Sequence, residues 1–178
     1  MRIPAQGGLK VDAASSTHVL SVLVDNEFGV LARVVGLFSA RGYNIESLTV
    51  AEVDRTQGWS RITIVTTGTP MTVEQIRSQI DRIVPVHKVV DLTLEGPYVA
   101  RDLLLVKVHG RGEKRVEALR IADIFRARVV DSTNRSFIFE LTGSAGKLDA
   151  FIDLMRPLGL AEVARTGAVA LARGDTPS

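Results

Sequence analysis

The same order of strand and helix patterns occurs twice along this chain, and this repeat narrows the folds that the chain can adopt. An apolar run of strand length covers residues 18–25, and apolar side chains then recur at helical spacing from Val30 to Phe38. Two further strand patterns, at residues 45–53 and 59–67, are separated by a short polar turn, which predicts a hairpin.

A second helix and a fourth strand complete the first half. Thr72 and Gln75 have the spacing of a capping box, so we expect the helix to begin at Thr72. Pro85 ends the helical pattern, because proline disrupts the hydrogen bonds of a helix interior. Residues 87–94 then alternate as a strand. The resulting order, β-α-β-β-α-β, is typical of a ferredoxin-like domain.

The second half of the chain repeats this order. Residues 103–108 have a strand pattern, and Ser144 and Pro157 bound a second-half helix. Residues 161–172 are expected to form one last strand. We therefore predict an α+β protein of two ferredoxin-like βαββαβ domains. The predicted boundaries are a flexible tail at residues 1–17, a first domain at residues 18–94, a linker at residues 95–100 and a second domain at residues 101–174.

Composition excludes several kinds of chemistry. The chain has 178 residues, of which 46% are hydrophobic and 24% charged, as is usual for a globular protein. It contains no cysteine, which rules out disulfides, thiolate nucleophiles and cysteine-based zinc sites. The 22 basic and 20 acidic residues nearly balance, and the resulting net charge of +2 predicts no nucleic-acid partner.

RNA binding is the alternative that a ferredoxin-like sheet raises, because exposed aromatic side chains on such a sheet can stack on bases. Trp59 lies only at the start of the third strand, and Phe137 and Phe139 share a strand face that we predict to be the core face. The basic side chains of residues 111–128 are either a solvated helix face or a contact surface for a larger partner. Neither observation favours RNA.

No stretch of the sequence approaches the length of a membrane span, which needs about 20 apolar residues. The first 17 residues lack the apolar run of a signal peptide. We therefore expect a cytoplasmic protein with no membrane partner.

Catalytic motifs are not found in the sequence. His18, His87 and His109 are far apart and do not have the spacing of metal ligands. Residues 143–148 are too few for a phosphate-binding loop, and Leu148 stands where a magnesium-binding Ser or Thr is needed. We predict no catalytic residue and no metal site, with an enzyme on a ferredoxin-like scaffold as the alternative.

The segment that joins the first strand to the first helix is the most informative one. Unpaired amides at the start of a helix attract carboxylates, and Gly29 lets a ligand approach the backbone closely. The side chain of Asn26 can both donate and accept hydrogen bonds, so it suits a zwitterion. The pattern fits an amino-acid site, but taken by itself it is better explained by an ordinary polar turn in which Asn26 caps the helix.

Residues 20–50 closely resemble the small, regulatory subunit of acetolactate (acetohydroxyacid) synthase. The run RGYNIESL at residues 41–48 is the most specific part of this resemblance. In the second half, three shorter segments resemble the same family: LVKV at residues 105–108, GKLDAF at residues 146–151 and EVARTG at residues 162–167.

The resemblance implies that the first domain is an ACT domain, which binds an amino acid between the two copies of a homodimer. It implies feedback inhibition by valine, and also by leucine or isoleucine. It further implies a catalytic large subunit that carries thiamine diphosphate, Mg²⁺ and FAD, whereas this chain has no cofactor and is no enzyme by itself. A free-standing amino-acid sensor is the alternative, and the resemblance of the second half argues against it.

The resemblance also assigns the site. One copy supplies Asn26 and the backbone of the helix start, and the paired copy supplies Asn44 and Ile45. Phe28 is large for its position in this family, where it lines the apolar side of the pocket or changes which ligand fits. The predicted effector site comprises Asn26, Phe28, Gly29, Val30, Leu31, Asn44 and Ile45.

Overall fold

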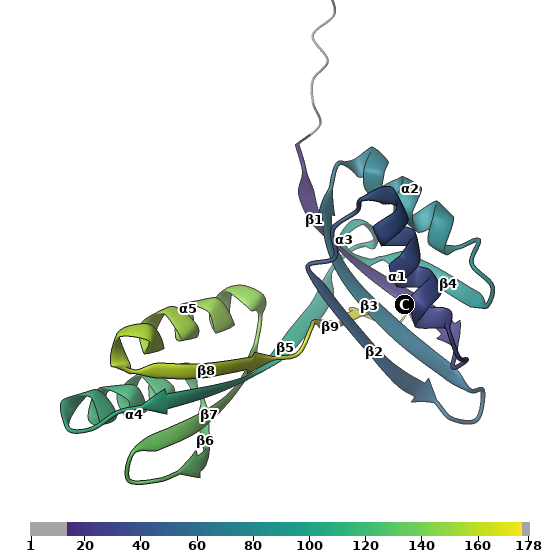
Figure 1. Cartoon of the computed structure of the whole chain (residues 1–178). Helices are drawn as coiled ribbons and strands as arrows, with labels where there is room; N and C mark the ends of the chain where they lie inside the picture. The colour runs from purple at the N-terminus through teal and green to yellow at the C-terminus, as the bar shows by residue number, and fades with distance from the viewer. Residues whose placement is uncertain (1–13, 176–178) are drawn as a thin grey trace, which may run out of the picture.

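The computed structural model describes residues 14–175 and shows two α+β domains joined by one long strand (Figure 1). Each domain is an antiparallel sheet with two helices packed on one of its faces. Both domains have the order β-α-β-β-α-β, so the predicted fold class is confirmed. Among the described residues, no helix has the length and apolar character that crossing a membrane requires.

The N-terminal domain has a four-stranded sheet in the order β2-β3-β1-β4. Its core lies between this sheet and the two helices, where Leu20 and Ile62 of the strands meet Phe38 and Ile76 of the helices. Both long helices lie on this face of the sheet, whereas Val19 and Val90 point to the other face, where Leu92 and Ala170 pack on them. Its elements are β1 (Ser16–Asp25), α1 (Val30–Arg41), β2 (Ser47–Asp54), β3 (Trp59–Gly68), α2 (Pro70–Ile80) and β4 (Val86–Asp91).

The C-terminal domain repeats this architecture, with strands in the order β6-β7-β5-β8. Phe137 and Phe139 of β7 are buried in its core, as predicted, so they form no exposed stacking platform. The elements are β5 (Tyr98–His109), α4 (Glu113–Phe125), β6 (Arg128–Ser132), β7 (Ser136–Gly143), α5 (Ala145–Met155), a 3₁₀ helix η1 (Arg156–Leu158), β8 (Leu160–Arg165) and β9 (Val169–Ala172).

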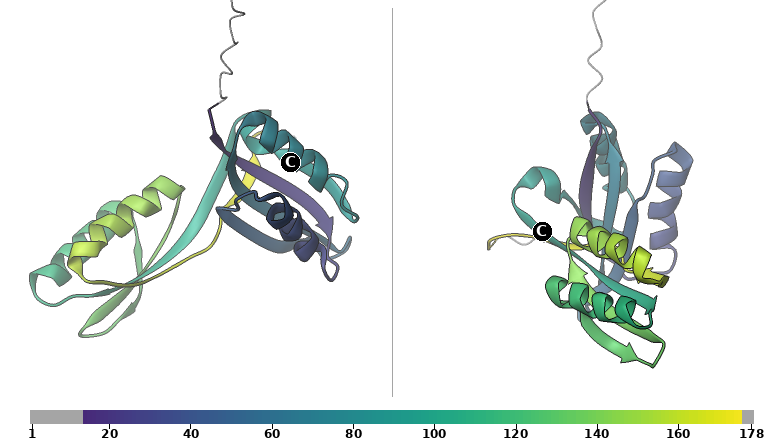
Figure 2. Two further views of the ribbon diagram at one scale, coloured as in Figure 1. Left: turned by 45° about the horizontal axis from the view of Figure 1, so that its top comes forward. Right: turned by 90° about the vertical axis from the view of Figure 1, so that its left-hand side faces the viewer.

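Strand β5 belongs to both halves of the molecule. Its first residues pair with β9, from Tyr98 opposite Ala172 to Arg101 opposite Val169, and its later residues pair with β7 and β8. The β5–β9 ribbon packs on the N-terminal domain (Figure 2), where Ala170 forms a small apolar cluster with Val19 of β1, Val90 of β4 and Leu92. The two domains therefore share a packed junction.

The structure differs from the predicted tail and linker. Ser16 and Thr17 belong to β1, because β3 is long enough to pair with them. The predicted tail otherwise falls largely on residues 1–13, which lie outside the described residues. Within the predicted linker, residues 98–100 are the first part of β5, since β9 returns to pair with them.

Two predicted strands are interrupted. The expected strand at residues 87–94 ends at Asp91, whose carboxylate accepts a hydrogen bond from the Thr93 amide and begins the short helix α3 (Leu92–Glu95). The expected strand at residues 161–172 is divided into β8 and β9 by residues 166–168. The chain leaves one sheet and joins another at that point.

The predicted start of the second helix is wrong by two residues. Pro70 is the first residue of α2, and the Thr69 hydroxyl accepts a hydrogen bond from the Thr72 amide at 3.2 Å. Proline suits a first helical position because its missing N–H has no helical partner there. Thr69, and not Thr72, is therefore the capping residue.

Thr69→Ala is expected to lower the free energy of unfolding by ~0.5–2 kcal/mol, because it removes this cap. Thr72→Ala is the matched control and should cost less, since the Thr72 amide keeps its partner. Urea unfolding of both variants measures the difference. A larger loss in Thr72→Ala would mean that the helix begins at Thr72.

Candidate functional site

The loop between β1 and α1 exposes most of the side chains predicted for the site. Asn26, Phe28 and Leu31 are all exposed, and Phe28 has no protein side chain covering it. The backbone amide of Asn26 donates to the Gly58 carbonyl at 2.7 Å, which fixes the backbone of the loop. The side chain of Asn26 is exposed to solvent. Val30 differs from its neighbours because it is buried in the core and anchors the helix start.

The start of α1 is left without a side-chain cap. Its capping position is Gly29, with a φ of 83°, and no side chain of the described residues hydrogen-bonds to this helix end. The alternative in which Asn26 caps the helix is therefore wrong. The first amides of a helix carry partial positive charge and lack partners within the helix. The loop thus presents helix-start amides without a side-chain cap beside an exposed carboxamide, and the Val30 amide lies 3.5 Å from the Glu27 carbonyl.

Neighbouring strands hold the base of this loop. The Asp25 carboxylate hydrogen-bonds with His87 Nε2 at 2.5 Å, and the Asp25 amide donates to the Pro85 carbonyl at 3.1 Å. The centroids of the His87 and Trp59 rings lie 5.2 Å apart. Trp59 of β3 also lies opposite Asp25 of β1 in the sheet. Sequence reasoning missed these supporting residues, because strand register alone brings them to the loop.

Asn44 and Ile45 lie at the other end of α1. The helix ends at Gly42, which has a left-handed backbone with a φ of 68°. Asn44 is exposed, and its carbonyl accepts a hydrogen bond from the Thr66 hydroxyl at 2.6 Å. Ile45 is partly buried against the N-terminal core. The structure therefore fixes the backbone of this segment and leaves the Asn44 side chain accessible.

One chain does not bring the two parts of the predicted site together. They are separated by the 12 residues of α1, a length of ~18 Å at the usual rise of an α-helix. A free amino acid is too short to touch both ends. The seven predicted residues form one site only if two copies contribute to it.

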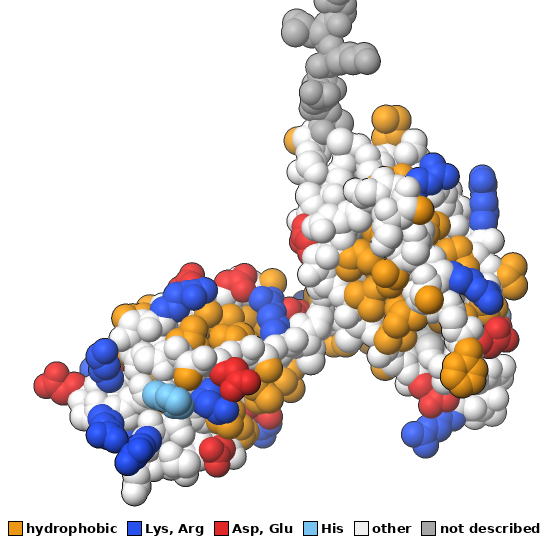
Figure 3. Space-filling model, in the orientation of Figure 1, with side chains coloured by type: hydrophobic (Ala, Val, Ile, Leu, Met, Phe, Trp, Pro, Cys, Tyr) orange, Lys and Arg blue, Asp and Glu red, His pale blue; other side chains and the backbone are white. Residues whose placement is uncertain are grey.

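An apolar surface lies between these two parts. In Figure 3, orange side chains gather over α1 and the adjacent region of the N-terminal domain. Val50 of β2 is 44% exposed, and Leu48 is half-buried on the same face of that strand. In the described part of the chain, β2 pairs on one side, with β3, and its other edge is open. Open edge strands pair readily with a second chain.

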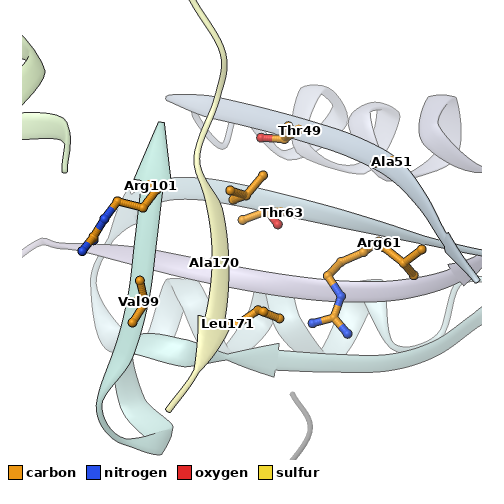
Figure 4. Close-up of a pocket in the computed structure, with 10 residues that line it drawn as sticks. Thr49, Ala51, Arg61, Thr63, Val99, Arg101, Ala170 and Leu171 are labelled. Carbon is orange, nitrogen blue, oxygen red and sulfur yellow. The ribbon is translucent and has the colours of Figure 1, made fainter. Parts of the chain in front are cut away.

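A separate cavity lies on the face of the N-terminal sheet opposite α1 and α2 (Figure 4). It has a volume of about 280 Å³ and contains none of the seven predicted residues. No local sequence pattern predicts this cavity, because its walls come from distant segments that the β5–β9 ribbon brings together. The lining residues are Thr49, Ala51, Val53, Arg61, Thr63, Val99, Arg101, Val169, Ala170 and Leu171.

Metal chemistry finds no support in the geometry of residues 14–175. No group of three His, Asp or Glu side chains there is arranged to hold a metal ion. The polar groups at the loop are the amides of the helix start, the Asn26 carboxamide and the exposed Glu27 carboxylate. This set of groups can bind a zwitterion reversibly.

Family models match both domains. Residues 20–88 match a model described as an AHAS small subunit-like ACT domain, which defines the N-terminal domain as an ACT domain. Residues 101–174 match a model described as the small subunit of acetolactate synthase. The chain belongs to the acetolactate synthase small-subunit family.

Relatives of full length support this assignment. The chain is 49% identical over 158 residues to the probable acetolactate synthase small subunit of Archaeoglobus fulgidus, covering 89% of this chain and 98% of that one. It is 47% identical over 159 residues to the acetolactate synthase isozyme 3 small subunit of Escherichia coli, covering 89% and 96%. The crystal structure of the acetolactate synthase small subunit from Thermotoga maritima superposes with a TM-score of 0.82 at 38% identity, over 90% and 99%.

Gly29→Ala is expected to lower the free energy of unfolding by about 1–2 kcal/mol. The new methyl group meets open space, so the cost comes from the left-handed backbone alone. Gly146→Ala is the matched control, because Gly146 is helical and also faces open space, and it should stabilise by ~0.5–1 kcal/mol. Thermal or urea unfolding that shows the same sign for both variants would contradict the strained geometry of the loop.

Proposed function

We propose that this chain activates the catalytic large subunit of acetolactate synthase and mediates its feedback inhibition by valine, with leucine or isoleucine as further effectors. The observation that carries the proposal is the uncapped start of α1 beside the exposed Asn26 in a chain of this family. Thiamine diphosphate, Mg²⁺ and FAD belong to the catalytic partner in this proposal, and the chain itself works without a cofactor.

The groups at the loop match those of an α-amino acid. The ligand carboxylate accepts hydrogen bonds from the first amides of α1, near Gly29 and Leu31. Its ammonium group donates to the side-chain oxygen of Asn26 or to that of Asn44 from the other copy. Its branched side chain lies against Ile45, with Phe28 as a further apolar wall.

Strand register supports the contribution of two copies. Asp54 pairs with Trp59, and Trp59 pairs with Asp25, so the end of β2 lies in one row with the base of the effector loop. Ser47 begins β2 at the opposite end, beside Asn44. Antiparallel pairing of two β2 edges about a twofold axis brings the Asn44 end of one copy to the loop of its mate.

The small difference in binding free energy between branched-chain amino acids limits how well one site can discriminate among them. One methylene group changes binding by only about 1–3 kcal/mol, so valine, leucine and isoleucine should be imperfectly separated. Coupling between an effector site and a distant catalytic site is typically about 1–3 kcal/mol and is reciprocal. The catalytic subunit therefore changes the affinity of this chain for valine by the same factor.

The experiment that tests the function is a valine titration of the catalytic subunit with and without this chain. We expect the chain to raise the rate of acetolactate formation and to make it sensitive to valine. Asn26→Ala should keep the activation and lose most of the inhibition, because it removes a ligand contact at the exposed loop. Calorimetry on the chain alone should show the same loss of valine binding.

Asn134→Ala is the control for this variant, since Asn134 is equally exposed but lies in the turn between β6 and β7. It should behave as the wild type does. Wild-type valine affinity in Asn26→Ala would remove the loop from the site, and a chain that leaves the catalytic subunit unaffected would refute the function.

Val50→Lys is expected to separate the two copies, because it places a charge on the open apolar edge of β2. Sedimentation should show the mass of one copy instead of two, and calorimetry should show the loss of valine binding. Val116→Lys, at an exposed position of α4, serves as the control and should stay paired. A paired Val50→Lys chain that still binds valine would exclude this edge as the interface.

A further inference from the structure

Residues 166–168, which we call the strap, connect β8 of the C-terminal domain to β9 on the N-terminal domain. The strap hydrogen-bonds to β2 at two points. The Thr49 hydroxyl donates to the Ala168 carbonyl at 2.6 Å, and the Ala168 amide donates to Ser47 Oγ at 3.0 Å. Both hydroxyls come from the ACT domain, and both backbone groups come from the strap.

The backbone of Gly167 lies so close to β2 that a side chain at this position would not fit. A Cβ atom at this position would lie 2.5 Å from Ser47 Oγ, 2.7 Å from Thr49 Oγ1 and 3.1 Å from the Leu48 carbonyl oxygen. Real Cβ atoms essentially never approach other atoms as closely as the first two distances, so a larger residue would either displace the strap from β2 or turn these two hydroxyls away from it. Glycine is needed here for close approach.

The other end of the strap is fixed to the C-terminal domain. The Thr166 amide donates to the Leu103 carbonyl at 3.0 Å, and the Leu103 amide donates to Thr166 Oγ1 at 3.0 Å. The preceding residue, Arg165, forms ion pairs with Asp102 at 2.7 Å and with Asp149 at 2.8 Å. Burial disfavours the charge of Arg165, but these hydrogen bonds outweigh it and raise its pKa above the ordinary value.

The contact with β2 lies next to the proposed effector site. Ser47 follows Ile45 by two residues, and the backbone between them is held by the Glu46 amide, which donates to the Val65 carbonyl at 2.9 Å. β9 does not fully cover the N-terminal sheet, because the cavity of about 280 Å³ lies between β9 and the strands that carry Thr49 and Thr63 (Figure 4). The strap is therefore a narrow contact between this part of β2 and the C-terminal domain.

We propose that the strap transmits effector binding from the ACT domain to the C-terminal domain through its contact with β2. This inference rests on the proposed function. A ligand that orders Asn44 and Ile45 also fixes the start of β2, and Ser47 and Thr49 carry that change to Ala168. Thr166 and Arg165 pass it to β5 and α5. Ser47, Thr49 and Gly167 are thus positioning residues that do not touch the ligand.

Thr49→Val tests the inference because it removes the hydroxyl that donates to Ala168 and keeps the size of the side chain. We expect the chain alone to bind valine nearly as the wild type does. The coupling factor, which is the ratio of valine affinities with and without the catalytic subunit, should fall by about fivefold or more. Activation without valine should not change. Gly167→Ala should have the same effect through displacement of the strap or of the two hydroxyls.

Hydrogen exchange on the full chain gives a second measurement that does not need the catalytic subunit. In the wild type, saturating valine should protect the strap and β8 as well as the effector loop. In Thr49→Val and Gly167→Ala, the protection should be confined to the ACT domain. Thr142→Val and Gly146→Ala are the matched controls, since both positions lie in the C-terminal domain away from β2, and both should keep the wild-type pattern.

The possible outcomes separate this inference from the proposed function. If the wild-type chain binds no branched-chain amino acid, the function fails and the inference fails with it. If the wild type binds valine but both strap variants keep full coupling and full protection of β8, the inference alone is overturned. Loss of activation together with inhibition would also overturn it, because the strap would then be needed only for the fold.

Discussion

Strand β5 forms hydrogen bonds with three other strands, and the arrangement of the molecule depends on this pairing. Its later residues are central in the C-terminal sheet between β7 and β8, while its first four residues pair with β9. A central strand cannot shift by one residue without turning its core side chains to solvent. Since Leu104 and Val106 are fully buried, the register of β5 is fixed, and with it the position of the β5–β9 ribbon on the ACT domain.

Local patterns predicted most of the fold, because the relevant interactions are close in sequence. The helical spacing from Val30 to Phe38 corresponds to α1, and Gly42 ends that helix as a left-handed cap. The structure differs from the prediction where pairing with a residue far away in the sequence determines whether a residue is in a strand. Ser16 is in a strand because Gly68 pairs with it, and Tyr98 is in a strand because Ala172 returns to it. No local pattern contains this information.

The candidate site stays a prediction, and its residues came from two sources. The loop with Asn26 and Gly29 was found from its residue types, and the resemblance added Asn44 and Ile45. The absence of a side-chain cap at α1 in the described residues, which rules out Asn26 as the capping residue, needed coordinates. The strap and the cavity could not be predicted, because no local pattern indicates that Gly167 lies against Ser47, which is 120 residues earlier in the chain.

Strand β2 contacts β3 and the strap, and in the proposed dimer it also contacts a second copy. The free energies of these contacts explain how one strand can take part in all three. Its pairing with β3 is extensive and fixes the strand in the sheet. Its contact with the strap consists mainly of two hydrogen bonds, each with a net contribution of about 0.5–1.5 kcal/mol. The sum is of the same order as the coupling of about 1–3 kcal/mol that links sites in regulatory proteins. A contact of this size can bias the C-terminal domain without unfolding either domain when it breaks. The open edge of β2 joins the second copy in the proposed dimer, so ligand binding at that edge and the strap act on the same few residues.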